Sequence, residues 1–315
     1  MRRLMTVLAV LALCITPALA KKKKKRNKGD QAEQSQTANP DVHSSWIGTL
    51  QHFKPGTSAN DLTNAYLLAN LTELAYGDTD GTLRQWASAM GCSDTHIERK
   101  KGKAMILCGR DDVVIATVQG SGSNTRDLER ACNADYRNKT LGGRVHEGGF
   151  NLSKELRGAL ESFLAKHPNK PVFLAGHSMG GLAALYMGAH MQRHLRRSPK
   201  AVFTFAVPRI GNREFRGNLD FAHYHYANHG DPVPLMYPDK FPPHNELQYF
   251  DKGGNLQRDE KPGKSAFNWV KEFGGAVDAV LKKGKTAHSM FVYVKNLRRN
   301  LSSAERDKLP EPKDF

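Results

Sequence analysis

The feature that most constrains this chain is the stretch at residues 172–190, which reads VFLAGHSMGGLAALYMGAH. Four apolar residues lead straight into a serine flanked by glycines, and the apolar spacing then becomes that of a helix. A strand that passes at once into a helix needs one sharp turn, and here Ser178 lies on it. Gly176 and Gly180 suit such a turn because strand and helix pass too closely there for side chains. We therefore predict a strand, a tight turn at Ser178 and a helix.

Strand and helix patterns alternate along the rest of the chain. Apolar residues at helical spacing predict helices, and short apolar or alternating runs predict strands. Helices are expected within 60–78, 82–91, 151–168 and 265–284, and strands within 104–120 (two runs about a GRDD turn), 171–176, 201–208 and 222–228. Periodicity alone leaves 288–297 open as helix or strand. Strands separated by helices predict an α/β fold with a mostly parallel central sheet flanked by helices.

The N-terminus has the features of a secretory signal. Two arginines precede an apolar run, and Ala18 and Ala20 have the spacing of a signal-peptidase site. The apolar run is short for a membrane span. We expect export to a secreted or periplasmic location with cleavage after Ala20. The predicted organisation is a signal peptide at 1–20, a basic linker at 21–42, one α/β domain at 43–301 and a polar C-terminal tail at 302–315.

Positive charge is concentrated directly after the predicted cleavage site. The formal net charge is +16, and Lys21 to Lys28, KKKKKRNK, carries seven positive charges. Such a run is attracted to anionic phospholipid headgroups, by up to about 1 kcal/mol per basic residue. Nucleic acid is the competing acidic partner, but no aromatic residue for base stacking is interleaved in the run. We predict peripheral contact with an anionic membrane and no nucleic-acid binding.

The cysteines fit an oxidising compartment. Cys14 leaves with the predicted signal, which leaves Cys92, Cys108 and Cys132, an odd number that cannot all pair within one chain. Cys92 and Cys108 flank a short polar segment and are the expected disulfide. The spacing suits no common zinc site, so we predict no metal.

Ser178 calls for a catalytic partnership, because a serine hydroxyl is a poor nucleophile until a base activates it. In an architecture with this turn, a carboxylate and then a histidine follow the serine along the chain. Asp231 lies where a strand ends and prolines prevent its continuation, so we assign it as the acid. The other aspartates considered after Ser178 have less clear strand-to-loop settings; they are Asp220, Asp239 and Asp251.

His288 is the histidine best placed to act as the base. It follows the last glycine-rich loop and begins an apolar segment, so its ring can project over the sheet. Two further candidates stay open, His229 and His244. The remaining ones fall in the helix after the serine or alternate within a strand, which favours structural or surface roles; they are His190, His194, His223 and His225.

The reaction also needs donors for a developing oxyanion. One is expected to be the backbone N–H of Met179, directly after the nucleophile, and the other an N–H after an earlier strand. The apolar run at 114–118 is followed by Gly120 and Ser121. We assign the Ser121 N–H as the second donor.

Taken together, these residues resemble the class 3, or fungal-type, lipase family. The resemblance spans roughly residues 60–295 and rests on motifs in a fixed order: VVIATVQGS, VHEGGF, GHSMGGLAALYMG, FTFAVPRIGNREF, NHGDPVPLMYP and HSMFVYV. It implies an α/β-hydrolase fold and hydrolysis of carboxylic esters without a cofactor. It also implies Ser178, Asp231 and His288 as the triad, with Ser121 and Met179 as the oxyanion hole. His146 in VHEGGF resembles a structural signature.

Two departures from the family pattern bear on function. Many members carry an Arg-Gly-Thr type sequence where this chain has Gln119, Gly120 and Ser121. The segment that corresponds to the family's lid, residues 122–143, is polar and charged, which predicts weak or absent interfacial activation.

Three readings besides a triacylglycerol lipase or esterase remain open from the sequence. A phospholipase A would use the same triad on anionic bilayers, and a transacylase would pass the acyl group to an alcohol other than water. A secreted surface-binding protein that kept the fold and lost the reaction belongs to a different class of function.

Overall fold

The predicted strands and three that were not predicted form a single sheet in the computed structural model, which describes residues 44–120, 141–231, 233–235, 247–257 and 287–314. Within these residues the sheet has eight strands in the order of the sequence, β1 to β8. β3 to β7 run parallel to one another, whereas β1–β2, β2–β3 and β7–β8 pair antiparallel. The strands are β1 (Asp94–Lys100), β2 (Lys103–Gly109), β3 (Val114–Val118), β4 (Val172–His177), β5 (Ala201–Phe205), β6 (Ala222–Asn228), β7 (Leu247–Phe250) and β8 (Leu256–Gln257).

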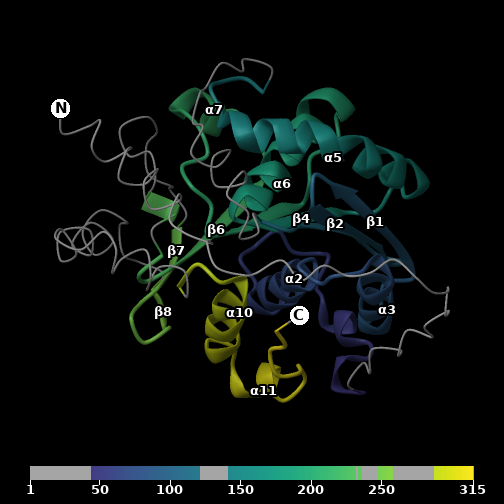
Figure 1. Cartoon of the computed structure of the whole chain (residues 1–315), viewed down its shortest axis with the longest axis vertical. Coiled ribbons are helices and arrows are strands. Elements are labelled where there is room, and N and C mark those ends of the chain that lie inside the picture. The colour runs from purple at the N-terminus through teal and green to yellow at the C-terminus, as the bar shows by residue number, and fades with distance from the viewer. Residues whose placement is uncertain (1–43, 121–140, 232, 236–246, 258–286, 315) are drawn as a thin grey trace, which may run out of the picture. The chain divides into compact units, whose positions relative to one another are not determined.

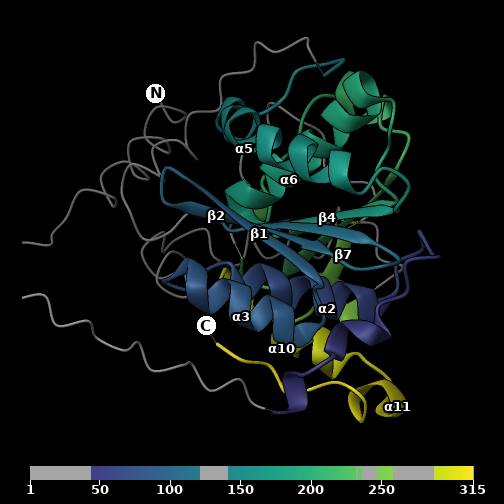
Figure 2. The ribbon, with the colours of Figure 1, turned by 90° about the vertical axis from the view of Figure 1, so that its right-hand side faces the viewer.

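Helices cover both faces of this sheet (Figures 1 and 2). Figure 2 shows α5 and α6 on one side and α2, α3 and α10 on the other. Each face has its own apolar core, because the side chains of a strand point alternately to opposite faces. The helices are α2 (Leu62–Leu74), α3 (Asp80–Met90), α5 (Glu147–Lys166), α6 (Ser178–His190), α7 (Arg213–Gly217), α10 (Met290–Arg299) and α11 (Ser303–Arg306). This arrangement confirms the predicted α/β fold.

The GRDD hairpin is also confirmed, since β2 and β3 are antiparallel neighbours. The edge strand β1 was not predicted. Its sequence, DTHIERK, buries only Ile97 and otherwise presents polar and charged side chains, so it lacks the apolar run of an interior strand. The disulfide Cys92–Cys108 is present as predicted and joins the residues that precede β1 to β2.

The structure decides the open assignment at 288–297 in favour of a helix. α10 begins at Met290 and buries Met290, Tyr293, Val294 and Leu297 on one face, at helical spacing. That face packs on the same side of the sheet as α2. His288 therefore stands just before a helix that is anchored in the core.

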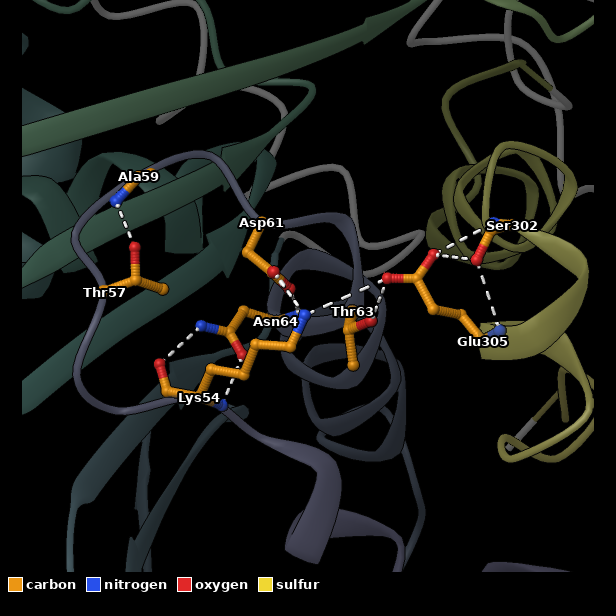
Figure 3. A network of polar contacts seen from close by, with 8 residues as sticks. All are labelled: Lys54, Thr57, Ala59, Asp61, Thr63, Asn64, Ser302 and Glu305. Atoms are coloured by element: carbon orange, nitrogen blue, oxygen red, sulfur yellow. Dashed lines mark hydrogen bonds and ion pairs between the residues drawn. The ribbon is translucent and has the colours of Figure 1, made fainter.

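Residues 302–314, most of the segment expected as a polar C-terminal tail, pack against α2. Ser302 caps α11, and Glu305 at the end of the capping box accepts a hydrogen bond of 2.9 Å from the Thr63 hydroxyl of α2 (Figure 3). Beyond α11, Leu309 is buried, and the Pro310 carbonyl accepts a 2.7 Å hydrogen bond from the Tyr66 hydroxyl. The segment is polar in composition, but its few anchoring residues find partners about 240 residues earlier.

Several sequence-based predictions lie outside the described residues. They concern the signal and basic linker at 1–42, the thiol of Cys132, most of the segment at 122–143 and the helical pattern at 265–284. In the described part of the chain, no helix is both long and apolar enough to cross a bilayer.

Candidate active site

The turn between β4 and α6 holds Ser178 in a strained backbone conformation. β4 ends at His177 and α6 begins at Ser178, whose φ of 53° lies in the left-handed region that side chains rarely adopt. A Cβ on Gly176 would lie 2.5 Å from the Gly180 carbonyl oxygen, and one on Gly180 would lie 2.2 Å from that of Gln119. At both glycines, strand, helix and neighbouring strand pass too closely to leave room for a Cβ.

His288 joins Ser178 to Asp231. Its Nε2 lies 3.1 Å from the Ser178 Oγ, and its Nδ1 lies 3.1 Å from each carboxylate oxygen of Asp231. Because an ionised carboxylate only accepts hydrogen bonds, Nδ1 carries the proton and Nε2 is free to accept the one from the serine hydroxyl. The three side chains predicted from the sequence are thus brought together in the order nucleophile, base and acid.

Asp231 is held by more than the histidine. Its side chain is fully buried, and it accepts hydrogen bonds from the Val233 N–H at 2.9 Å and from the Tyr293 hydroxyl at 2.6 Å. The same Tyr293 oxygen accepts a bond of 3.0 Å from the Asn228 N–H. Burial, and next the charge of Asp231, raise the pKa of Tyr293 well above its ordinary value, so the hydroxyl stays protonated and donates.

Tyr293 is a residue of the candidate site that the sequence did not predict. It lies five residues after His288 in HSMFVYV, where the core face of α10 returns beneath the base. Asn228, at the end of β6, was missed as well: its side-chain amide donates to the Ala287 carbonyl at 2.9 Å and so holds the residue before His288. The sequence offers one indication of Tyr293: it is a tyrosine among apolar residues in 288–297, a segment that periodicity leaves open as helix or strand.

The N-terminus of α6 carries the expected first oxyanion donor. The first backbone N–H groups of a helix have no acceptor within the helix, and the side chain of the N-cap residue His177 makes no capping hydrogen bond here. The Met179 N–H is among them, one residue beyond the nucleophile. Ser121, the expected second donor, lies outside the described residues. Gly120 just before it is described, and a Cβ there would lie 2.7 Å from the His177 carbonyl oxygen.

The alternative histidines have other partners in the described residues. His229 Nδ1 lies 2.6 Å from the Tyr249 hydroxyl, and His190 Nε2 lies 2.8 Å from Glu161. His223 Nε2 lies 2.9 Å from the Thr204 hydroxyl, on the strand predicted for it. His146 is the N-cap of α5, which agrees with a structural role. His244 lies outside the described residues.

The alternative aspartates are likewise used elsewhere. Asp220 accepts a hydrogen bond from the Ser198 hydroxyl at 2.7 Å, and Asp251 accepts backbone bonds from Gly253 and Asn255 in its own turn. Asp239 lies outside the described residues. Within the described ranges, no group of three or more His, Cys, Asp and Glu side chains is arranged to hold a metal ion.

The central part of the chain is similar to known proteins of one family. Residues 115–241 match the family described as Lipase (class 3). Over 93 residues the chain is 31% identical to the toxin TseL of Vibrio cholerae, and over 89 residues it is 35% identical to a lipase of Rhizopus niveus. These matches span 29% and 26% of this chain, but only 14% and 22% of the two relatives. The solved triacylglyceride lipase of Rhizomucor miehei aligns with 61% of this chain and 81% of its own, at 18% identity and a TM-score of 0.49.

Proposed function

We propose, from the match of residues 115–241 to the class 3 lipase family, that the chain is a serine hydrolase of lipid carboxylic esters. One observation carries the proposal: the His288 ring bridges the Ser178 hydroxyl and the buried Asp231 carboxylate at 3.1 Å on each side. That geometry is the one in which an imidazole takes a serine proton and is itself stabilised by a carboxylate.

The proposed mechanism follows from these contacts. His288 Nε2 takes the Ser178 proton as the hydroxyl oxygen attacks the ester carbonyl, and Asp231 stabilises the imidazolium that forms. The N–H groups of Met179 and Ser121 bind the developing oxyanion. The protonated imidazole then gives its proton to the leaving alcohol, and a water molecule activated by the same ring hydrolyses the acyl-enzyme. No step of this mechanism requires a cofactor.

The substrate class is proposed as triacylglycerols or smaller carboxylic esters. The cationic run at Lys21 to Lys28 favours a second candidate, phospholipase A activity on anionic bilayers, because it would concentrate the enzyme at such a surface. For this candidate we expect affinity for anionic vesicles that falls with salt and disappears on deletion of residues 21–28. Affinity unchanged by the deletion would argue against it.

Export is proposed on the signal-like residues 1–20, with cleavage after Ala20. The Cys92–Cys108 disulfide supports it, since disulfides persist in oxidising compartments. N-terminal sequencing of the mature protein tests the cleavage site.

The direct test of function compares the mature protein with Ser178→Ala on a soluble butyrate ester, a long-chain triglyceride emulsion and anionic phospholipid vesicles. We expect the wild type alone to hydrolyse at least one, and the preferred substrate separates esterase, lipase and phospholipase. Labelling by a fluorophosphonate, read by intact mass, should add one adduct to the wild type and none to Ser178→Ala. A folded wild type that neither hydrolyses an ester nor takes the label would overturn the proposal.

Interfacial activation is proposed to be weak or absent, because the sequence of 122–143 is polar and charged. Specific activity is therefore expected to rise smoothly through the solubility limit of the ester. A jump at the onset of emulsion formation would contradict this.

A further inference from the structure

His177 directly precedes Ser178 in the chain, and its side chain is buried. It is the last residue of β4 and is only 4% exposed. Its ring centroid lies 4.7 Å from that of His288 and 5.9 Å from that of Tyr76. His177 therefore lies between the proposed base and a tyrosine that follows α2.

Both ring nitrogens of His177 are hydrogen-bonded, and the partners fix their roles. Nε2 lies 2.8 Å from the backbone carbonyl oxygen of His288, which can only accept, so Nε2 carries the proton and donates. Nδ1 lies 2.6 Å from the Tyr76 hydroxyl and in this tautomer accepts from it. The Tyr76 oxygen in turn accepts a bond of 2.9 Å from the Gly120 N–H. A single chain of bonds thus runs from Gly120 through Tyr76 and His177 to the backbone of His288.

The protonation states agree with these roles. Burial, and next the charge of His288, lower the pKa of His177 well below its ordinary value, so its ring is neutral. Burial likewise raises the pKa of Tyr76, so its hydroxyl keeps the proton that it donates. Near neutral pH, therefore, neither His177 nor Tyr76 gains or loses a proton.

The chain of hydrogen bonds ends at two parts of the site that must be placed relative to each other. Gly120 leads into Ser121, the proposed oxyanion donor, and His288 is the proposed base. The approach at Gly120 is close: a Cβ there would lie 2.5 Å from the Tyr76 oxygen and 2.9 Å from His177 Nδ1. The bonds therefore connect two loops that are more than 160 residues apart in sequence and have no common helix or strand.

We propose that Tyr76 and His177 are positioning residues that set the oxyanion turn and the general base relative to each other through this chain of hydrogen bonds. The inference rests on the proposed serine hydrolase function and adds two residues to it. Because the chain acts on geometry, its loss lowers kcat and leaves KM for a small ester nearly unchanged. Misplacement of a base and an oxyanion donor by a fraction of an ångström costs about 10- to 100-fold in kcat.

The variants separate the two bonds of His177. Tyr76→Phe removes the hydroxyl that links Gly120 to Nδ1. His177→Gln places an amide N–H near the position of Nε2 and keeps the donation to the His288 carbonyl, whereas His177→Ala removes both bonds. The matched control is Tyr66→Phe, which removes a tyrosine hydroxyl whose partner is the Pro310 carbonyl, remote from the triad.

The kinetic result expected is a fall of about 10- to 100-fold in kcat for Tyr76→Phe and His177→Ala, with KM within about twofold of wild type and partial recovery in His177→Gln. Affinity for a boronic acid, which forms a tetrahedral adduct on Ser178, should fall in parallel with kcat. Tyr66→Phe should lower the free energy of unfolding without changing kcat or KM. Wild-type kcat in Tyr76→Phe and His177→Ala would overturn the inference, as would a loss confined to KM.

A spectroscopic readout keeps this inference separate from the proposed function. Nitrogen-15 imidazole spectra of the wild type should show His177 as the neutral Nε2–H tautomer from pH 5 to 9, and Tyr76→Phe should shift its Nδ1 resonance. A titrating His177 or an Nδ1–H tautomer would overturn the inference even in an active enzyme. The expected spectra in a protein without ester hydrolysis would instead overturn the function and leave the bonding intact.

Discussion

The two halves of the candidate site are built by different means. The nucleophile half is set by the local backbone, since Ser178 lies on a turn with φ of 53° and the flanking glycines allow approaches at which any Cβ would overlap main-chain atoms. In the acid–base half, Asp231 and His288 are 57 residues apart, and hydrogen bonds from Tyr293 and Asn228 hold them. One added methyl group should therefore disrupt the nucleophile half as a whole. In the acid–base half, the loss of one hydrogen bond should lower activity only in part, because the other bonds remain.

The largest loss of activity is expected at Ser178, where the nucleophile half meets the acid–base half. Ser178→Ala removes the nucleophile and should lower kcat by at least about 10⁴-fold, because the remaining groups provide only binding and oxyanion stabilisation. Ester hydrolysis and thermal melting are measured together with Ser153→Ala, a buried serine whose hydroxyl bonds to the Phe150 carbonyl in α5. Activity in Ser178→Ala within tenfold of wild type would remove Ser178 from the mechanism.

Gly180→Ala tests the steric half. Its added methyl group would lie 2.2 Å from the Gln119 carbonyl oxygen, so β3, β4 and α6 must separate, and we expect a loss of about 2 to 4 kcal/mol in unfolding free energy. Activity should fall by about 100-fold or more because the turn moves with the helix. Gly158→Ala in α5 is the control, since a Cβ there meets nothing within 4 Å. Urea denaturation should show the two alanines changing stability in opposite directions; equal stability would break the comparison.

Tyr293→Phe tests the hydrogen-bonded half. It removes the 2.6 Å bond to Asp231 and leaves the Asn228 N–H without its acceptor, a cost of about 1 to 3 kcal/mol in stability. Because His288 and Val233 still hold Asp231, kcat should fall only about tenfold. The matched control is Tyr186→Phe, whose hydroxyl likewise donates one hydrogen bond, to the Ile210 carbonyl, and accepts one from a backbone N–H, that of His146. A fall in kcat as large as that of Ser178→Ala would show that the loss of a single hydrogen bond disables the acid–base half completely.

Glu73→Gln separates stability from activity and should change activity least. Burial is the main cause that raises the pKa of Glu73, in α2, from 4.5 to about 8, with the nearby Asp314 adding to it. The folded protein therefore holds this proton more tightly than the unfolded chain. Its contribution to stability is complete below about pH 4.5 and is lost as the pH rises through 8.

Glu73→Gln stays neutral and should gain stability relative to wild type by about 3 to 4 kcal/mol between pH 5 and pH 9. Chemical denaturation at the two pH values gives this difference, and kcat at pH 7 should equal that of wild type. Parallel stability curves for the two proteins would show that Glu73 ionises normally in the folded state.

The same contrast explains what could be predicted from the sequence. The turn at Ser178 was predictable because its determinants, an apolar run, two glycines and a helical pattern, are contiguous. Asp231 and His288 were predictable because each is a residue of the required kind in a loop at the expected place along the chain. The sequence alone did not exclude His229 as the base, whereas in the structure its ring bonds to Tyr249. Tyr76 and His177 could not be predicted as a pair, because their bond joins residues 101 apart and no local pattern marks it. The same holds for Glu305, whose partner Thr63 is 242 residues away.

The packing of residues 302–314 against α2 has a consequence for the order in which the chain matures. His288 precedes α10, and the segment beyond that helix is fastened to residues Thr63 and Tyr66 near the start of the domain. A nascent chain still emerging from the ribosome holds Ser178 before it holds His288 or the segment that packs against α2. The candidate site can therefore be completed only once His288 has been synthesised, 110 residues after the serine.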